Sequence, residues 1–270
     1  MPDNAREAYC FFEVDGSLPI LRRSFVEAVG TCLLTVAMVG SGLAVQHKLT
    51  DEPLVASIII ALSIAGSLVG LIVAMGKVSG GHYNPLITIG QWLRGERTTA
   101  CTISYVLAQI AGGICGSLIA TFMFQGTVRP SFGETPSMGL AVSEFVAAAG
   151  LLIIVISCAR SSKWDTGPFA VGAWLTAAIL ATPSTSYANP AVTIAATMAG
   201  GPVSLSVPTA ATFAVAQLLG LVAALLVTRI AFGGSRRRIS DPRAQPGSGP
   251  AIRPDCNDQP NVFAQWKERR

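Results

Sequence analysis

Charged residues are scarce in this chain. Asp, Glu, Lys and Arg make up 13% of its 270 residues, whereas 51% are hydrophobic, and a soluble domain carries about 25% charged residues. Histidine is scarcer still, with His47 and His82 as the two in the sequence, and the six cysteines include no CxxC pair. These shortages argue against a soluble enzyme, a disulfide-stapled domain and a histidine-rich catalytic or metal site. We therefore expect no enzymatic activity, no bound metal and no cofactor.

Six nearly uncharged runs account for most of the sequence. A membrane-spanning helix needs about 20 apolar residues, with a range of about 17 to 25. Each run is compatible with one span, although the third is long and the fifth is short. The sequence therefore predicts an all-α membrane protein with six spans. The runs are 24–45, 54–76, 98–124, 137–159, 167–182 and 203–228.

Lys and Arg are divided unequally between the two sides of these spans. With the N-terminus inside, the outer loops hold only Lys48 and Arg129. The inner flanks hold Arg22, Arg23, Lys77, Arg94, Arg97, Arg160, Lys163, Arg229 and Arg236 to Arg238. Because positive residues remain on the cytoplasmic side, we expect both termini there, in a multi-pass protein of the cell (inner) membrane.

The two ends of the chain differ from its middle. Residues 1–21 are polar and acidic and do not resemble a cleavable signal, so we expect a cytoplasmic segment and a first span that directs insertion. Residues 233–270 are basic and rich in Pro, Gly and Ser, which is typical of a disordered tail. The predicted membrane domain is thus 22–232.

Three markers recur in the same order in two halves of this domain, about 22–125 and 137–232. Each half holds three spans, an odd number, so the second half enters the membrane from the opposite side. That arrangement is an inverted repeat about an axis in the membrane plane. The markers are a Glu, an Asn-Pro pair and a Gln: Glu27, Asn84-Pro85 and Gln109, then Glu144, Asn189-Pro190 and Gln217.

Each Asn-Pro pair starts an apolar segment that is too short to cross a membrane, 84–93 and 189–198. Asn is a strong helix N-cap, and Pro suits the first helical position. Ten residues at about 1.5 Å each rise about 15 Å, half of a ~30 Å hydrocarbon core. We therefore predict two half-helices that enter from opposite faces and meet at the midplane.

Together these features resemble the aquaporin, or major intrinsic protein, family of channels. The resemblance is carried by "SGGHYNPLIT" from Ser79, by "NPAVT" from Asn189, by the paired glutamates and by the six spans in two inverted halves. It covers roughly residues 22–232. It implies an aquaporin-like fold, a homotetramer with one pore in each protomer, and passive diffusion that needs no cofactor.

The resemblance also implies roles for individual residues. Asn84 and Asn189 would donate to a permeating molecule and, with the positive helix ends, repel cations and protons; the simpler alternative is that they are only caps. Glu27 and Glu144 resemble the family's loop braces rather than carriers of a transported proton, and His82 resembles a histidine that lines or supports the inner vestibule. The pore-centre residues would be Asn84, Pro85, Leu86, Asn189, Pro190 and Ala191.

The chain departs from the family at Val192, where an arginine usually completes the outer selectivity filter. Counting along the repeat gives Ile64, Ala177 (or Ala178) and Ser186 as the other filter positions. Small side chains widen a pore mouth, and loss of arginine removes five N–H donors and a fixed charge. In this respect the chain resembles bacterial members that lack the filter arginine, which are linked to arsenical export.

We therefore expect passage of small neutral solutes, either glycerol-like polyols or metalloid hydroxides such as arsenite, and possible conduction of water. One alternative is a water-selective aquaporin. Another, from a different class, is an ion-coupled secondary transporter, because such proteins are also built from inverted repeats with broken helices.

Overall fold

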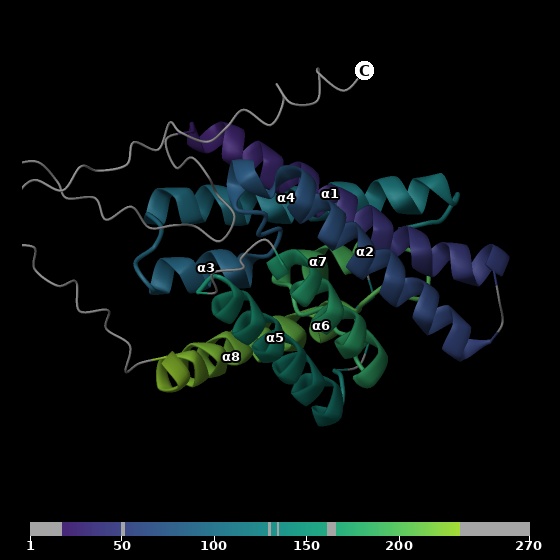
Figure 1. The fold of residues 1–270 in the computed structure, drawn as a ribbon. Helices are drawn as coiled ribbons and strands as arrows, with labels where there is room; N and C mark the ends of the chain where they lie inside the picture. Colours follow the sequence, from purple (N-terminus) through teal and green to yellow (C-terminus); the bar gives the residue numbers. More distant parts are fainter. Residues whose placement is uncertain (1–17, 50–51, 129–130, 134, 161–165, 233–270) are drawn as a thin grey trace, which may run out of the picture. The chain divides into compact units, whose positions relative to one another are not determined.

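The computed structural model of the protein describes residues 18–49, 52–128, 131–133, 135–160 and 166–232. The basic tail and most of the N-terminal segment predicted above lie outside these residues. The described part is helical and repeats one order of elements, three long or intermediate helices with one short helix placed third (Figure 1). The helices are α1 (Ile20–Ala44), followed by a short π-helix η1 (Val45–Leu49), then α2 (Pro53–Ser79), α3 (Pro85–Leu93), α4 (Thr99–Met123), α5 (Met138–Cys158), α6 (Gly167–Ala181), α7 (Pro190–Ala196) and α8 (Val207–Phe232).

Five helices of the described chain are long and apolar enough to cross a membrane: α1 with its π-helical extension, α2, α4, α5 and α8. The sixth expected span is α6, which has 15 residues and therefore rises only about 22 Å. The sequence predicted this helix to be short. The structure thus has the all-α membrane architecture that the runs indicated.

Local sequence signals explain where these helices begin. The Thr98 hydroxyl accepts from Cys101 N (3.3 Å) at the start of α4, and the Ser206 hydroxyl accepts from Thr209 N (3.2 Å) at the start of α8. Hydroxyl caps of this kind satisfy N–H groups that have no partner within the helix. Because Ser206 caps it, α8 begins at Val207, four residues later than the predicted run.

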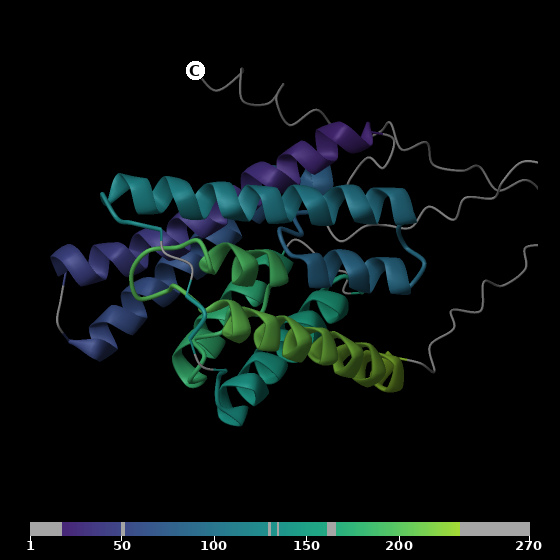
Figure 2. The same cartoon turned by 180° about the vertical axis from the view of Figure 1, so that it is seen from behind.

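Within each half, the first and last helices make the most extensive contacts. These equivalent pairs are α1 with α4 and α5 with α8. Figures 1 and 2 show the first pair along one side of the described chain and the second pair along the other. Glycines permit the α1–α4 contact: a Cβ on Gly112 would lie 2.1 Å from the Ala28 carbonyl oxygen, and one on Gly116 would lie 2.2 Å from that of Cys32. Small residues are used in this way where helices pack closely in lipid.

The short helices α3 and α7 lie between these pairs. α3 contacts α4, α5, α7 and α8, and α7 contacts α1, α3, α4 and α8, so both half-helices are enclosed by protein. α7 is three residues shorter than its predicted segment because the N–H groups of Thr197, Met198 and Ala199 bond to carbonyls three residues back. This tighter pattern ends the helix in a turn.

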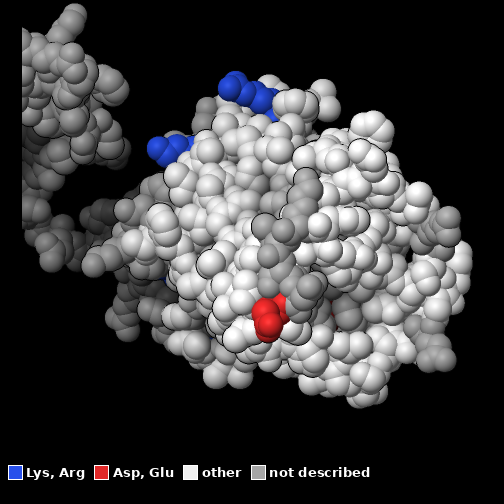
Figure 3. Space-filling view, turned by 90° about the vertical axis from the view of Figure 1, so that its right-hand side faces the viewer, with Lys and Arg blue, Asp and Glu red and all other residues white. Residues whose placement is uncertain are grey.

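The outer surface of the described bundle is largely apolar. Figure 3 shows one face on which charged side chains are few. Large hydrophobic side chains project from it on several helices, with Leu21 83%, Phe122 84% and Ile230 84% exposed. Exposed apolar surface of this extent needs a non-aqueous environment, which the hydrocarbon of a bilayer provides.

Candidate pore between two half-helices

The two Asn-Pro pairs cap the half-helices and join them to each other. The Asn84 side-chain oxygen accepts from Leu86 N (2.9 Å), and that of Asn189 accepts from Ala191 N (3.0 Å) and Val192 N (3.4 Å). Each of these side chains also donates to the loop of the other half, as the next bonds show. Both asparagines are therefore helix caps, which is one of the two interpretations of these residues.

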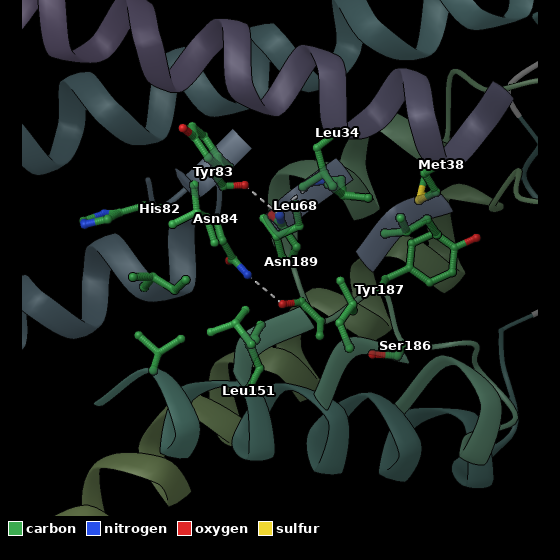
Figure 4. Close-up of a pocket in the computed structure, with 18 of the residues that line it drawn as sticks. Leu34, Met38, Leu68, His82, Tyr83, Asn84, Leu151, Ser186, Tyr187 and Asn189 are labelled. Atoms are coloured by element: carbon green, nitrogen blue, oxygen red, sulfur yellow. Dashed lines mark hydrogen bonds between the residues drawn. The ribbon is translucent and has the colours of Figure 1, made fainter. Parts of the chain in front are cut away.

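The cross-bonds run in both directions. Asn84 Nδ2 donates to the Ala188 carbonyl oxygen (2.9 Å), and Asn189 Nδ2 donates to that of Tyr83 (2.8 Å) (Figure 4). Both acceptor residues have left-handed backbones, with φ of 47° for Tyr83 and 46° for Ala188. An amide nitrogen carries two N–H groups, so each Asn retains one for a molecule in the cavity that both side chains line.

Glu27 holds the loop before α3 in this strained conformation. Its Oε1 accepts from Ser79 Oγ (2.6 Å) and His82 N (3.0 Å), and its Oε2 accepts from Tyr83 N (2.7 Å) and Gln109 Nε2 (2.7 Å). The side chain is 0% exposed. Four donors on one carboxyl group offset its burial and fix the backbone ahead of the cap.

Glu144 does the same for the loop before α7. Its Oε1 accepts from Ser184 Oγ (2.6 Å) and Tyr187 N (2.9 Å), and its Oε2 accepts from Ala188 N (2.9 Å) and Gln217 Nε2 (2.7 Å). This carboxyl is also 0% exposed. Neither glutamate lines the cavity, so both have the contacts of loop braces.

Sequence reasoning missed four residues that complete the braces. Gln109 Nε2 also donates to Thr88 Oγ1 (3.0 Å), and Gln217 Nε2 donates to Thr193 Oγ1 (2.9 Å). These threonines each follow the motif Asn by four residues, and Ser79 and Ser184 each precede it by five. That equal spacing was a signal available in the sequence, although only the glutamines were used there, as markers of the repeat.

His82 lies beside the first half-helix and lines the cavity. Its Nδ1 is 2.9 Å from Thr88 Oγ1, and its ring meets the edge of Tyr105 at a centroid distance of 5.6 Å. The Tyr105 hydroxyl donates to the Ser79 carbonyl (2.9 Å), and the Arg97 guanidinium lies over its ring at 4.3 Å. A packed shell therefore fixes the imidazole at the cavity wall.

A cavity of about 60 Å³ lies along this junction. Aliphatic side chains from α1, α2, α5 and α6 form most of its wall, and the two loops supply its polar part. None of the described residues that line it is Asp, Glu, Lys or Arg. Figure 4 shows the Asn pair near its centre, His82 toward one end and Met38, Tyr187 and Ser186 toward the other.

The predicted filter residues divide into two groups. Ile64, Ser186 and Val192 line the cavity. Ala177 does not: it is exposed on the outer surface of α6, whereas Ala178 is 2% exposed. Ala178, the other alternative for this position, does not line the cavity either. The α6 residues that line the cavity are Val171 and Leu175.

The six predicted pore-centre residues also divide. Asn84 and Asn189 line the cavity, whereas Pro85, Leu86, Pro190 and Ala191 do not. Leu86 and Ala191 are 0% exposed and occupy the first turns of their half-helices. They serve the packing of α3 and α7, whereas the asparagines offer side-chain amides at the centre.

Two opposed half-helices around an uncharged cavity, inside an apolar helical bundle, define a membrane channel. The family model described as Major intrinsic protein matches residues 16–186 of the chain, which is more than half of it. The protein therefore belongs to the major intrinsic protein family. It is an integral multi-pass membrane protein and a passive channel for small neutral solutes.

Individual relatives agree with this assignment. Aquaglyceroporin AqpS of Rhizobium meliloti (strain 1021) is 35% identical over 211 residues, which are 78% of this chain and 90% of the relative. Aquaporin TIP1-1 of Arabidopsis thaliana is 33% identical over 184 residues, 64% of this chain and 73% of the relative. The X-ray structure of the aquaglyceroporin from Plasmodium falciparum matches with a TM-score of 0.61 at 16% identity, covering 78% of this chain and 95% of that one, and supports the fold.

Proposed function

We propose that this channel passes solutes larger than water, either glycerol-like polyols or metalloid hydroxides such as arsenite. The observation that carries the proposal is the uncharged, mostly aliphatic wall of the 60 Å³ cavity. Such a wall excludes ions, because nothing replaces their hydration shell. A neutral hydroxy compound needs few partners, and the two asparagine amides provide donors. The name of AqpS, an aquaglyceroporin, supports the larger solutes.

Within this function we assign roles to the lining residues. Asn84 and Asn189 donate to the solute at the pore centre, and the N-terminal ends of α3 and α7 repel cations and protons there. Ile64, Ser186 and Val192 form the outer level of the pore, with Ala177 (or Ala178) as the fourth filter position, and Val192 replaces an arginine there. His82 lines the opposite vestibule.

Two further expectations belong to this proposal. The inner-side excess of Lys and Arg supports cytoplasmic termini and a location in the cell (inner) membrane, with a channel domain of about 22–232 between a cytoplasmic N-terminal segment and a basic tail. A homotetramer with four separate pores is the assembly implied by the family resemblance. Crosslinking in native membranes, followed by mass measurement, tests that assembly.

An ion-coupled transporter is the less favoured alternative. Coupling needs an ionisable or ion-coordinating group in the path, and Glu27 and Glu144 are the candidates. Each already accepts four hydrogen bonds, and neither lines the cavity. Solute uptake that requires a proton gradient and is lost in Glu27→Gln would overturn the channel interpretation.

Stopped-flow measurements on proteoliposomes test the proposed solute. Water, glycerol and arsenite permeabilities are compared between the wild type and Val192→Arg. We expect the wild type to pass glycerol or arsenite, and the arginine to lower their permeability at least about tenfold while water falls less. A wild type that passes water alone is a water-selective aquaporin, and equal permeabilities in both proteins would remove Val192 from the determinants of selectivity.

A further inference from the structure

A second, smaller cavity lies against the first, between α3 and α5. Its volume is about 10 Å³, compared with about 60 Å³ for the larger one. Ile87 and Val155 line both cavities. The remaining residues of the smaller cavity are Gly90, Gln91, Arg94, Leu152, Ile156 and Ala159. Gln91 and Arg94 lie at the end of α3, so this cavity lies farther from the asparagines along α3, toward the predicted cytoplasmic side.

We propose that Ile87 and Val155 form an inner constriction that sets the upper size limit of the solute. A pore discriminates by size where its path is narrowest. The path is open at the outer level, because Ile64, Ser186 and Val192 line one continuous cavity. On the inner side of the asparagines, where His82 also lies, Ile87 and Val155 line the larger cavity and separate it from the smaller one.

The positions of both side chains are fixed by the surrounding frame. Ile87 is in the first turn of α3, three residues after the capping Asn84, and is followed by Thr88, which is bonded to His82 and Gln109. Val155 is on α5, the helix that carries the Glu144 brace. Ile and Val are β-branched, so each has a strongly preferred χ1 rotamer. Neither side chain therefore turns easily out of its position.

The internal repeat supplies a comparison for this pair. Counting from the motif Asn, Ile87 is equivalent to Val192; counting from the bracing Glu, Val155 is equivalent to Met38. Val192 and Met38 also line the larger cavity. Val192 is smaller than Ile87 but Met38 is larger than Val155, so the two pairs differ little in bulk; Met is unbranched and flexible, so the outer pair is the more adaptable of the two. The stiffer pair is on the inner side.

The chemistry of the inner pair also selects against charge. Two aliphatic side chains offer no hydrogen bond, so a solute must cross this point with part of its water shell removed. A compact neutral molecule loses little on doing so, whereas an ion or a longer polyol loses more. The inference rests on the channel activity and not on the choice between glycerol and arsenite.

Alanine substitutions and a series of polyols of increasing length test the constriction. Ile87→Ala and Val155→Ala are reconstituted in proteoliposomes, and glycerol, erythritol and xylitol permeabilities are each divided by the water permeability. We expect the erythritol-to-water ratio to rise at least about fivefold in either variant. Ile89→Ala and Ile154→Ala are matched controls, because both side chains pack beside the core but line neither cavity, and their ratios should stay within about twofold of the wild type.

A substitution in the outer pair tests whether the inner or the outer level of the pore limits the size of the solute. Met38→Ala should change the erythritol ratio less than Val155→Ala does; an equal or larger effect of Met38→Ala would overturn the inference. So would folded Ile87→Ala and Val155→Ala proteins, with unchanged size-exclusion elution, whose ratios match the wild type. If the alanine variants do not fold, Val155→Ile tests the reverse change, and glycerol permeability should fall at least about threefold, with unchanged flux contradicting the constriction. Arsenite is absent from this readout, so failure of the proposed solute leaves the size series interpretable.

Discussion

The two halves of the channel use the same frame and line it with different residues. In each half a buried glutamate accepts from a serine, two loop N–H groups and a glutamine, and that glutamine also reaches a threonine on the half-helix. The bond lengths of equivalent pairs differ little. The frame is thus duplicated together with its hydrogen bonds, which explains why the spacings repeat in sequence.

The two residues before each motif Asn do not repeat, although all four line the cavity. The first half has His82 and Tyr83 where the second has Tyr187 and Ala188. Gly30 lies against the Tyr83 ring, since a Cβ there would lie 2.0 Å from Tyr83 Cε1. At these positions the hydrogen bonds of the frame hold the backbone and not the side chain. The side chains can therefore differ between the two halves.

The largest expected effect comes from removing a brace. Glu27→Ala or Glu144→Ala leaves four buried donors without their acceptor, at about 1–3 kcal/mol each, a total that is comparable to the whole stability of a typical domain. We expect almost no folded protein from either, measured as monodisperse protein after detergent extraction, and a partial loss for the isosteric Gln variants. If one Ala variant folds normally and the other does not, the two braces are not equivalent.

Removing an asparagine cap should have the second-largest effect on stability. Asn84→Ala or Asn189→Ala removes a cap and a cross-bond, and we expect a loss of about 3 kcal/mol of unfolding free energy. Asn84→Asp keeps the capping oxygen but cannot donate to the Ala188 carbonyl, so it should lose less. Thermal unfolding in detergent, followed by tryptophan fluorescence, measures all three. A full loss in Asn84→Asp would mean that the cross-bond, and not the cap, carries the effect.

Giving one half the smaller or larger residue that the other half has at the equivalent position should lower the stability less. Gly30→Ala forces the Tyr83 ring to move, at about 1–3 kcal/mol. The equivalent positions in the second half are Ala147 and Ala188, where a small loop residue leaves room for the methyl group. In the double variant Gly30→Ala, Tyr83→Ala the two costs should therefore be less than additive by at least about 1 kcal/mol. Additive losses in a thermal double-mutant cycle would show that Tyr83 does not require the glycine.

The smallest expected effect concerns a feature without a counterpart. Arg94 and Glu96 form an ion pair after α3, whereas the equivalent residues after α7 are Ala199 and Gly201. Both side chains are partly exposed, so Glu96→Gln should change the unfolding free energy by less than about 1 kcal/mol, and less again in high salt. A larger loss would indicate that this pair orders the inner end of the half-helix.

Much of this fold could be predicted because its signals are local or repeated. Hydrophobic runs found the long helices, and Asn-Pro found both half-helices to within three residues. The count could not choose between Ala177 and Ala178, because counting back from Asn189 crosses residues 182–189, which are not helical, so the helical phase of α6 was not defined by the count. That phase follows from which side of α6 packs inward.

The pore wall was less predictable for a different reason. Val155 and Met38 belong to long apolar runs in which every residue looks alike, and only the packing of several helices decides which of them line a cavity. The repeat held the necessary information, since each is eleven residues after its bracing glutamate. It could be used only once the structure had shown that Val155 and Met38 line the cavity.

The cross-bonds between Asn84 and Ala188 and between Asn189 and Tyr83 join residues 104 and 106 positions apart. A ribosome adds roughly 5–20 residues per second, so the first loop waits on the order of 5–20 s before its partner has been made. During that time the first half-helix is without the contact that closes its end. Biogenesis therefore requires that the first three spans, or the insertion machinery around them, shelter an unfinished polar loop at membrane depth until the second half arrives.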